Sequence, residues 1–359
     1  MTRREEQILQ WIREDPLISQ QELAERAGIT RSSVGVHIAN LIKKGYLRGR
    51  GYLLGEESGV TVVGAVNVDI SGTPDTELLA GDSNPGHVRV TLGGVGRNIA
   101  ENLSRLGHPV RMITALGEDA HSAQVRQGCR EAGIDLTHSL TVPNGRTSTY
   151  LCLNDERGEI VGAVSDMAIY DALTPAFLQT RLEVINRSRL VVADGNLSAE
   201  SLSFLGRNVT APLFADPVSV KKAGRLAGLL RAVTVIKPNR PEASLLTGVD
   251  IQTREDLPRA AQVFFCMGVK NVLISLGGEG VYFDDGRDRG VLNVLPGPIL
   301  NTNGCGDAFL AAAADGFLAG LSLRECARRG LAASSLCARS ESAVSPLLCP
   351  DALQTLLQS

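Results

Sequence analysis

The sequence predicts a large α/β domain on a mostly parallel sheet, preceded by a small helical domain. Short apolar segments alternate with helical segments over most of the chain, which is typical of βαβ units. Aromatic residues make up only 4%, while glycine is abundant, which suits an α/β enzyme better than an all-β protein. The 359 residues allow two domains, which we expect at residues 1–56 and 57–359.

Composition also indicates the cellular compartment in which the protein is expected. The seven cysteines form no C-x-x-C pair and no Cys/His metal spacing, which favours reduced thiols. Residues 1–6 lack an apolar signal core, and no run approaches the ~20 apolar residues that a membrane span needs. The net charge of -3 argues against a chain that is basic throughout. We therefore expect a cytoplasmic protein with no membrane partner.

The first fifty residues predict three short helices and a basic hairpin. Residues 4–13 carry an apolar helical face, and Ser19 with Glu22 is a capping-box signature for a second helix. Thr30 caps a third helix, and residues 46–54 predict a two-stranded wing. This order is typical of a winged helix-turn-helix.

Charge makes DNA an expected partner of residues 1–54. This segment has nine Lys and Arg against six Asp and Glu, although the whole chain is net negative. Polar and basic side chains are expected at the major groove and at phosphate: Arg31, Ser32, Ser33 and His37 on the third helix, and Arg48 and Arg50 on the wing. The alternative is a small helical domain for protein contacts or self-association.

The large domain begins with a buried strand at residues 60–66. Asn67 and Asp69 follow at its end, where open α/β sheets bind ligands. Side chains at i and i+2 of an extended chain face the same way, so this pair suits neighbouring hydroxyl groups, although it equally fits a turn. The remaining elements follow in order: strands at 110–115, 190–193, 212–215, 232–236 and 271–276, and helices at 122–132, 174–185, 241–247 and 254–267.

A glycine-rich turn opens the next helix. Residues 93–98 read Gly-Gly-Val-Gly-Arg-Asn, whose glycines let a ligand approach the backbone and whose Asn98 reaches the same place. The turn is neither a dinucleotide fingerprint nor a Walker A loop, because it does not follow the first strand directly and contains no Gly-Lys-Ser/Thr. Strand patterns that interrupt the βα alternation predict a small lid sheet, inserted around 70–92 and 146–166.

The stretch Asn301-Thr302-Asn303-Gly304-Cys305-Gly306-Asp307 precedes a run of helix formers at 308–321. A glycine-rich turn at a helix start points backbone N–H groups at one place, and the helix dipole adds positive charge, so the turn suits an anion. Asp307 is placed to take a proton from a hydroxyl that attacks a phosphate. The alternative, from these residues alone, is a loop with an N-capping Asp.

In this order, the motifs resemble those of the ribokinase-like (PfkB) family of carbohydrate kinases. Asn-Arg-Pro-Glu at 239–242 and Ser-Leu-Gly-Gly-Glu-Gly at 275–280 complete the pattern, which covers residue 60 to the C-terminus. The resemblance implies an αβα sandwich with a small β-sheet lid, and transfer of a phosphoryl group from ATP. It implies that Asp307 is the base and that the amides of Gly304, Cys305 and Gly306 form the anion hole.

The resemblance also implies the binding residues. Asn239 and Glu242 would organise Mg²⁺ through water. The acceptor would contact Asn67, Asp69, Gly93, Gly94, Asn98, Thr149 and Asn196, besides Asp307. The nucleotide would contact Asn239, Ser275, Gly277, Gly280, Gly304 and Gly306. Asp216, Pro217 and Lys221 are further candidates for the site lining, with ordinary turn and surface residues as the alternative.

Two positions in the late glycine stretch depart from the family pattern, and residues 117–122 lack the family's second glycine. Asn301 stands where the family usually has an Asp that helps to hold a monovalent cation, so a K⁺ site at Asn301 and Asn303 stays open. Cys305 replaces the usual Ala, and we interpret it as structural because the motif acts through its backbone N–H groups.

A winged-helix head joined to such a kinase resembles the architecture of bacterial pseudouridine kinases. Hydroxyl-bearing side chains at 147–150 would lie over the acceptor and bind the polar edge of a nucleobase, although strand propensity also explains them. Pseudouridine is thus the expected acceptor, with another nucleoside or a simple sugar as alternatives. A nucleoside-sensing transcriptional regulator is the alternative from another class. The family also implies a homodimer.

Overall fold

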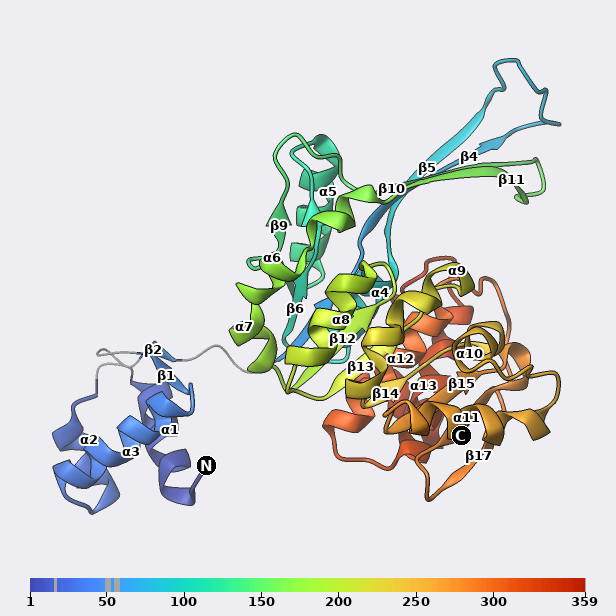
Figure 1. The fold of residues 1–359 in the computed structure, drawn as a ribbon. Coiled ribbons are helices and arrows are strands. Elements are labelled where there is room, and N and C mark those ends of the chain that lie inside the picture. The colour runs from blue at the N-terminus through green and yellow to red at the C-terminus, as the bar shows by residue number, and fades with distance from the viewer. Residues whose placement is uncertain (16–17, 49–52, 55–58, 359) are drawn as a thin grey trace. The chain divides into compact units, whose positions relative to one another are not determined.

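The structure, a computed structural model, describes residues 1–15, 18–48, 53–54 and 59–358. The chain separates into two compact units, Met1–Ser58 and Gly59–Ser359 (Figure 1). No helix among the described residues is long and apolar enough to cross a membrane.

The first unit has the three predicted helices and a short two-stranded sheet. Its elements are α1 (Arg3–Glu14), α2 (Gln20–Ala27), α3 (Arg31–Lys43), β1 (Leu47–Arg48) and β2 (Leu53–Leu54). Ser19 and Glu22 form the predicted capping box of α2, and the Thr30 hydroxyl accepts from Ser33 N–H at the start of α3. Arg50 and the side chain of Arg48, both expected at phosphate, lie outside the described residues.

The second unit is built on a nine-stranded sheet in the order β17-β16-β15-β14-β13-β12-β3-β6-β8. Its strands are β3 (Val60–Val63), β6 (Val110–Ile113), β8 (Ile134–Asp135), β12 (Leu190–Asp194), β13 (Leu213–Asp216), β14 (Val235–Ile236), β15 (Asn271–Ser275), β16 (Val281–Asp284) and β17 (Arg289–Leu292). The pairs from β8 to β15 are parallel, whereas β15-β16-β17 is antiparallel. The predicted mostly parallel sheet is therefore confirmed, with an antiparallel edge that the alternation did not predict.

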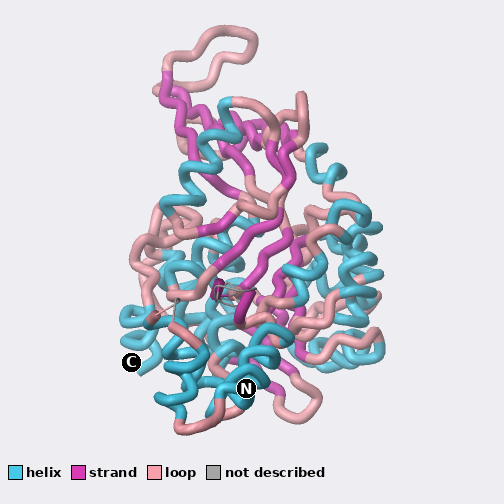
Figure 2. The backbone as a smooth tube through the Cα atoms, turned by 90° about the vertical axis from the view of Figure 1, so that its left-hand side faces the viewer, coloured by secondary structure: helices cyan, strands magenta, loops and turns pink. Residues whose placement is uncertain are grey.

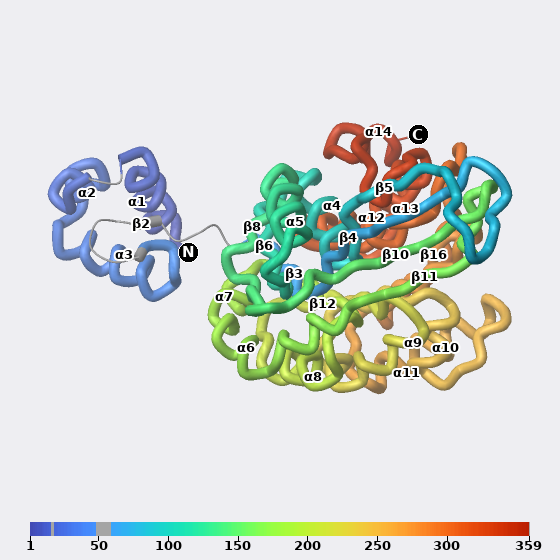
Figure 3. The backbone as a smooth tube through the Cα atoms, turned by 90° about the horizontal axis from the view of Figure 1, so that it is seen from above, coloured from blue at the N-terminus to red at the C-terminus, as the bar shows by residue number. Residues whose placement is uncertain are grey.

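Helices cover both faces of this sheet, as Figures 2 and 3 show. They are α4 (Val95–Arg105), α5 (Ala120–Glu131), α6 (Pro175–Gln179), α7 (Leu182–Asn186), α8 (Ala199–Asn208), α9 (Val220–Ala223), α10 (Arg240–Thr247), α11 (Leu257–Cys266), α12 (Cys305–Leu318), α13 (Leu323–Ala338) and α14 (Pro350–Gln358), with short 3-10 turns η1 (Ala168–Ala172), η2 (Gly224–Gly228), η3 (Leu230–Ala232), η4 (Arg254–Asp256) and η5 (Gly277–Glu279). One continuous helix was expected at 174–185. The structure has two short helices there, α6 and α7, so that prediction was wrong.

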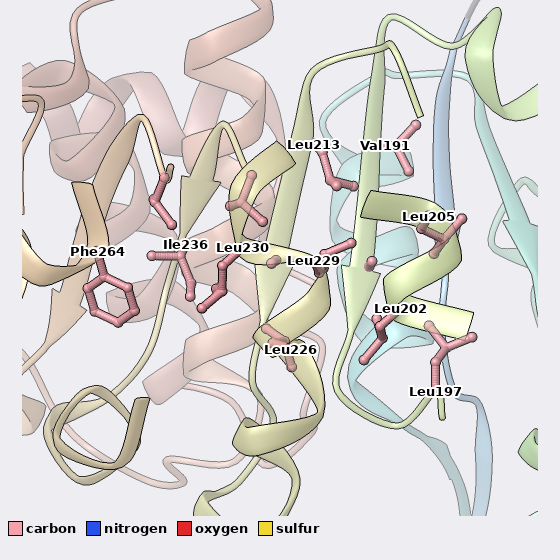
Figure 4. Packing of buried hydrophobic residues seen from close by; sticks show 14 of the residues in the cluster. Val191, Leu197, Leu202, Leu205, Leu213, Leu226, Leu229, Leu230, Ile236 and Phe264 are labelled. Carbon is pink, nitrogen blue, oxygen red and sulfur yellow. The ribbon is translucent and has the colours of Figure 1, made fainter. Parts of the chain in front are cut away.

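Alternate residues of the central strands enter two separate cores. Val191 and Ala193 of β12 pack in a cluster with α8 and α11, part of which is drawn in Figure 4, whereas Leu190 and Val192 pack in a second cluster with α4 and α12. Successive side chains of a strand point to opposite faces, so a sheet covered on both faces must be apolar throughout. This explains why the strands read as continuous apolar runs.

A second, four-stranded sheet extends from the body of this unit (Figure 1). Its order is β11-β10-β4-β5, with β4 (Asn67–Pro74), β5 (Gly86–Gly93), β10 (Thr149–Asn154) and β11 (Ile160–Asp166). We call it the lid sheet. A further parallel pair, β7 (Ala115–Leu116) and β9 (Leu140–Thr141), lies outside both sheets.

Candidate active site

Asp307 lies in the first turn of α12, buried and in contact with the early glycine turn. Asn98 Nδ2 donates to Asp307 Oδ2 at 2.8 Å, although the two residues are 209 positions apart. Burial raises the pKa of Asp307 to about 7, and the nearby Asp216 carboxylate adds to that rise. The carboxyl is thus poised near neutrality, which suits a general base.

The glycines before Asp307 fix the start of α12. Gly304 has a φ of 79°, and a Cβ there would lie 1.9 Å from Ala343 O, so neither conformation nor space admits another residue. Gly304 also caps a helix whose N-terminus has no side-chain cap. The amides of Cys305 and Gly306 therefore start α12 at its positive dipole end. The loop does not follow a strand directly, since β17 ends at Leu292.

Lys237 lies beside this loop and is not among the predicted site residues. A Cβ on Gly306 would be 3.3 Å from Lys237 Nζ, and Nζ is 3.1 Å from Asp216 Oδ2. Burial favours the neutral amine, but the carboxylates of Asp216, Glu242 and Asp307 outweigh it and raise the pKa of Lys237. A buried ammonium thus stands at the mouth of the predicted anion hole. The available signal was a lysine directly after strand β14, just before the Asn-x-x-Glu motif.

Asn239 and Glu242 form a capping box at the start of α10. Glu242 N–H donates to Asn239 Oδ1 and Asn239 N–H donates to Glu242 Oε2, both at 2.9 Å. Burial raises the pKa of Glu242. In the described part of the chain, no three His, Cys, Asp or Glu side chains gather as a metal site. Because the capping bonds engage both side chains, this pair fits Mg²⁺ held through water and phosphate rather than in a protein cage.

The predicted nucleotide residues adjoin this cap. Ser275 ends β15 and pairs with Asn239 through an isolated parallel bridge. Gly277 has a φ of 61° and Gly280 a φ of 100°, and a Cβ on Gly280 would lie 1.9 Å from Leu292 O. The turn therefore requires glycine at Gly280 for both conformation and space.

The acceptor candidates meet at the base of the lid sheet. Asn67 and Asp69 share one face of β4, as predicted, and Asn67 accepts a hydrogen bond from Ser148 Oγ at 3.0 Å. A Cβ on Gly93 would be 1.9 Å from Asp69 Oδ2, and one on Gly94 would be 2.6 Å from Ala65 O. Glycine is therefore needed for this close packing.

The carboxyl group of Asp69 has one buried, unsatisfied oxygen in the part of the chain that the structure describes. Burial raises its pKa to about 6, partly offset by Arg97. Among the described residues, its buried Oδ1 has no hydrogen-bond partner. An unsatisfied buried oxygen is costly unless a ligand or water supplies the donor. Asp69 Oδ1 is therefore a candidate contact for a hydroxyl group or a water molecule.

Strand register separates Thr149 from Asp69. Thr149 pairs with Val68, whereas Tyr150 pairs with Asp69, and paired residues share a face. The Thr149 hydroxyl donates to Thr147 O at 3.1 Å. Thr149 thus faces away from Asp69, contrary to the expected acceptor contact. Tyr150 lies on the Asp69 face and takes its place as the lid candidate.

Asn196 is buried beside β12 and is held by Lys222, a second lysine that is not among the predicted site residues. Asn196 N–H donates to Asp194 Oδ1 at 2.9 Å, and Lys222 Nζ donates to Asn196 Oδ1 at 2.6 Å. Lys222 also contacts Met167 Sδ at 3.4 Å, just after lid strand β11. Burial lowers the pKa of Lys222. The neighbouring candidate Lys221 is exposed, so the lysine that lines this region is Lys222.

Asn301 and Asn303 are engaged within the protein. Asn301 Nδ2 donates to Glu341 O at 3.0 Å, and Asn301 Oδ1 accepts from Asn303 N–H at 2.9 Å. The Cys337 thiol lies 3.5 Å from Asn303 O and 3.3 Å from Ala343 O. Hydrogen-bond donors of the protein therefore already contact the carbonyl oxygens of Glu341, Asn303 and Ala343.

Comparison with known proteins links both units to families. Residues 58–348 match the pfkB family of carbohydrate kinases, and residues 1–48 match a winged helix-turn-helix DNA-binding family. An uncharacterized sugar kinase, YeiI, of Escherichia coli (strain K12) is 33% identical over 98% of both chains. The pseudouridine kinase of the same organism is 35% identical over 78% of this chain and 90% of its own.

A solved structure has the same fold. A putative sugar kinase from Clostridium perfringens superposes with a TM-score of 0.76 at 30% identity, covering 84% of this chain and 96% of the other.

Proposed function

The chain belongs to the pfkB family of carbohydrate kinases, and within it we propose that the protein transfers the γ-phosphoryl group of ATP to the 5′-hydroxyl of pseudouridine. The hydrogen bond between Asn98 and Asp307 carries the proposal, because it joins the acceptor turn to the base. The family identity makes the chain a sugar or nucleoside kinase, and the acceptor is the proposed part.

Each group of residues in the site has a separate role in the proposed phosphoryl transfer. Asp69 and Asn67 hold the acceptor's ring hydroxyls, while Asn98 orients Asp307. Asp307 takes the proton of the attacking hydroxyl, and the amides of Gly304, Cys305 and Gly306, with Lys237, stabilise charge on the transferring group. Mg²⁺, organised by Asn239 and Glu242, would neutralise phosphate charge.

Lys222 favours a nucleoside over a bare sugar. Its ammonium, fixed between Asn196 and Met167, has donors suited to a carbonyl oxygen on a base. The similarity to a pseudouridine kinase supports the same acceptor class. The competing acceptors are other nucleosides, ribose and hexoses.

ATP consumption with each acceptor tests the proposal. We expect pseudouridine to give the highest kcat/KM among pseudouridine, uridine, other nucleosides, ribose and fructose. Lys222→Met should raise the KM for the nucleoside about 10-fold, the loss of a charged hydrogen bond, and should change the KM for ribose less, through Asn196 alone. Lys221→Met, an exposed neighbour, is the matched control. A higher kcat/KM for ribose or fructose would refute the proposed acceptor.

The pH profile of kcat/KM should report Asp307. Because the pKa of Asp307 is raised to about 7 and the base must be ionised, kcat/KM should fall about tenfold per pH unit below pH 7 and level off above it. Steady-state kinetics across this range provide the measurement. A profile that stays flat through pH 7 would rule out this role for the carboxyl.

K⁺ should have little effect on turnover. The amide of Asn301 and the thiol of Cys337 already contact the carbonyl oxygens of Glu341, Asn303 and Ala343. We expect less than a 2-fold change in kcat when K⁺ replaces a bulky organic cation at constant ionic strength. A much larger activation would show that the region binds the cation after all.

We also propose that the N-terminal unit binds DNA. Arg31 and Ser32 are exposed at the start of α3, and the unit carries net positive charge. Electrophoretic shifts at low salt should weaken as salt rises, and Arg31→Ala should weaken them further. A response to nucleoside would support a regulatory role, whereas the absence of any shift at low salt would remove DNA binding.

The proposed homodimer rests on one face of the lid sheet. Cross-strand register aligns exposed aliphatic residues there: Val88, Val90, Leu151, Leu153 and Val164. A second copy would bury such a face in a self-complementary contact. Leu151→Asp should therefore yield monomers in sedimentation experiments, whereas Leu79→Asp in the β4–β5 connection should not. A monomeric unmodified protein would contradict the proposal.

A further inference from the structure

We propose that Cys305 and Cys337 are a peroxide-sensitive dithiol whose closure to a disulfide switches off phosphoryl transfer by displacing the anion loop. The effect on turnover rests on the proposed role of that loop, whereas formation of the disulfide does not.

The two thiols lie where α12 and α13 meet, each against the other's backbone segment. Cys305 Sγ is 3.6 Å from Ser334 O, one turn before Cys337 on α13. Cys337 Sγ is 3.5 Å from Asn303 O, two residues before Cys305. Ser334 Oγ also donates to Cys305 O at 2.8 Å, which ties the two segments together. A disulfide therefore needs only a local approach of neighbouring groups.

Their surroundings give the two thiols different roles. Cys305 is partly exposed at the N-terminus of α12, whereas Cys337 is fully buried. A helix N-terminus favours a thiolate. Cys305 is thus the group that meets an oxidant first, and Cys337 is the resolving thiol.

The chemistry balances with a peroxide as the oxidant. The Cys305 thiolate attacks one peroxide oxygen, the O–O bond breaks, and Cys305 becomes a sulfenic acid as hydroxide leaves. The Cys337 sulfur then attacks the Cys305 sulfur, the S–O bond breaks, and water leaves with the thiol proton. Overall, two thiols are oxidised to one disulfide and one hydrogen peroxide is reduced to two waters.

Closure strains the loop because Cys305 is part of it. An S–S bond is about 2.05 Å long, so the two sulfurs must leave their contacts with Ser334 O and Asn303 O and move together. Gly304 packs against Ala343, whose carbonyl oxygen also contacts Cys337 Sγ at 3.3 Å. Movement of Cys305 toward Cys337 therefore shifts the amides beside it and disturbs this packing. A misplacement of about 1 Å in such a site costs about 10²-fold in rate.

Hydrogen peroxide treatment of the full chain tests the proposal with two separate readouts. We expect at least 10-fold loss of turnover, restored by dithiothreitol, together with a cross-linked peptide joining Cys305 to Cys337 in the mass spectrum. The double variant Cys266→Ala/Cys349→Ala, which removes the two exposed cysteines, should behave like the unmodified protein. Cys337→Ala should form no cross-link and should instead trap a sulfenic acid at Cys305 that reacts with dimedone.

The possible results distinguish failure of the disulfide switch from failure of the proposed kinase function. Oxidised protein without the cross-linked peptide, or with the cross-link and full activity, would overturn the switch. If no acceptor is phosphorylated at all, the cross-link remains measurable and only the proposed function fails. Cys337→Ser provides a second variant if Cys337→Ala does not fold, as judged by its thermal melt.

Discussion

Replacing Asp307 by Asn is expected to lower kcat by about 10³-fold. General-base catalysis contributes about 10²–10⁴-fold, and an amide cannot take the hydroxyl proton. Asn is nearly the same shape, and it keeps an oxygen that can accept the hydrogen bond from Asn98 Nδ2. Steady-state kinetics with saturating ATP and acceptor measure the loss. Asp351→Asn, which changes an exposed acid in the first turn of α14, is the matched control.

Thermal unfolding distinguishes lost chemistry from lost structure in this variant. The pKa of Asp307 rises from an ordinary 3.8 to about 7 on folding, so the native state binds a proton that the unfolded state has released. The free energy of unfolding therefore falls as pH rises from 3.8 to 7, and the penalty is complete above pH 7. Asp307→Asn should melt above the unmodified protein at pH 8, with no difference below pH 4. An inactive variant that also melts lower would point to misfolding.

Replacing Lys237 by Met is expected to lower kcat by about 10²–10³-fold, the loss seen when one preorganised donor to a developing charge is removed. Lys237 Nζ adjoins Gly306 and Asp216, so its charge lies at the place where the transferring phosphoryl group is proposed to pass. Single-turnover kinetics separate this chemical step from binding.

The double variant Lys237→Met/Asp216→Asn separates catalysis from charge balance. Met alone leaves the Asp216 carboxylate buried and unpaired, which costs about 3–5 kcal/mol of stability. Neutralising Asp216 as well should restore the melting temperature but not kcat. If the double variant regained nearly full turnover, Lys237 would serve only to neutralise Asp216.

The antiparallel edge shows where alternation in the sequence misleads. The βα pattern predicted a parallel sheet, yet β15, β16 and β17 follow one another without helices and pair antiparallel. The apolar pattern of a buried strand does not indicate its direction in the sheet. The connection does: the short 3-10 turn η5 joins β15 to β16, whereas a parallel pair needs a long crossover.

The Asn-x-x-Glu motif shows a similar ambiguity. Its spacing is that of a capping box, and Asn239 and Glu242 do cap α10. The same residues match the metal motif of the family. Sequence alone does not separate these roles, because a cap at a helix N-terminus also places polar oxygens where phosphate and its cation bind.

The sequence by itself determined the two-unit organisation, the α/β fold and the Gly304–Asp307 turn, because helix periodicity, caps and glycine conformations are local properties of the chain. The tertiary structure decided which distant groups share the site. It brought Asn98 to Asp307, Lys237 to Gly306 and Cys337 to Asn303, and it turned Thr149 away from Asp69 by strand register. Such contacts depend on packing between elements far apart in the chain, and no local pattern encodes them.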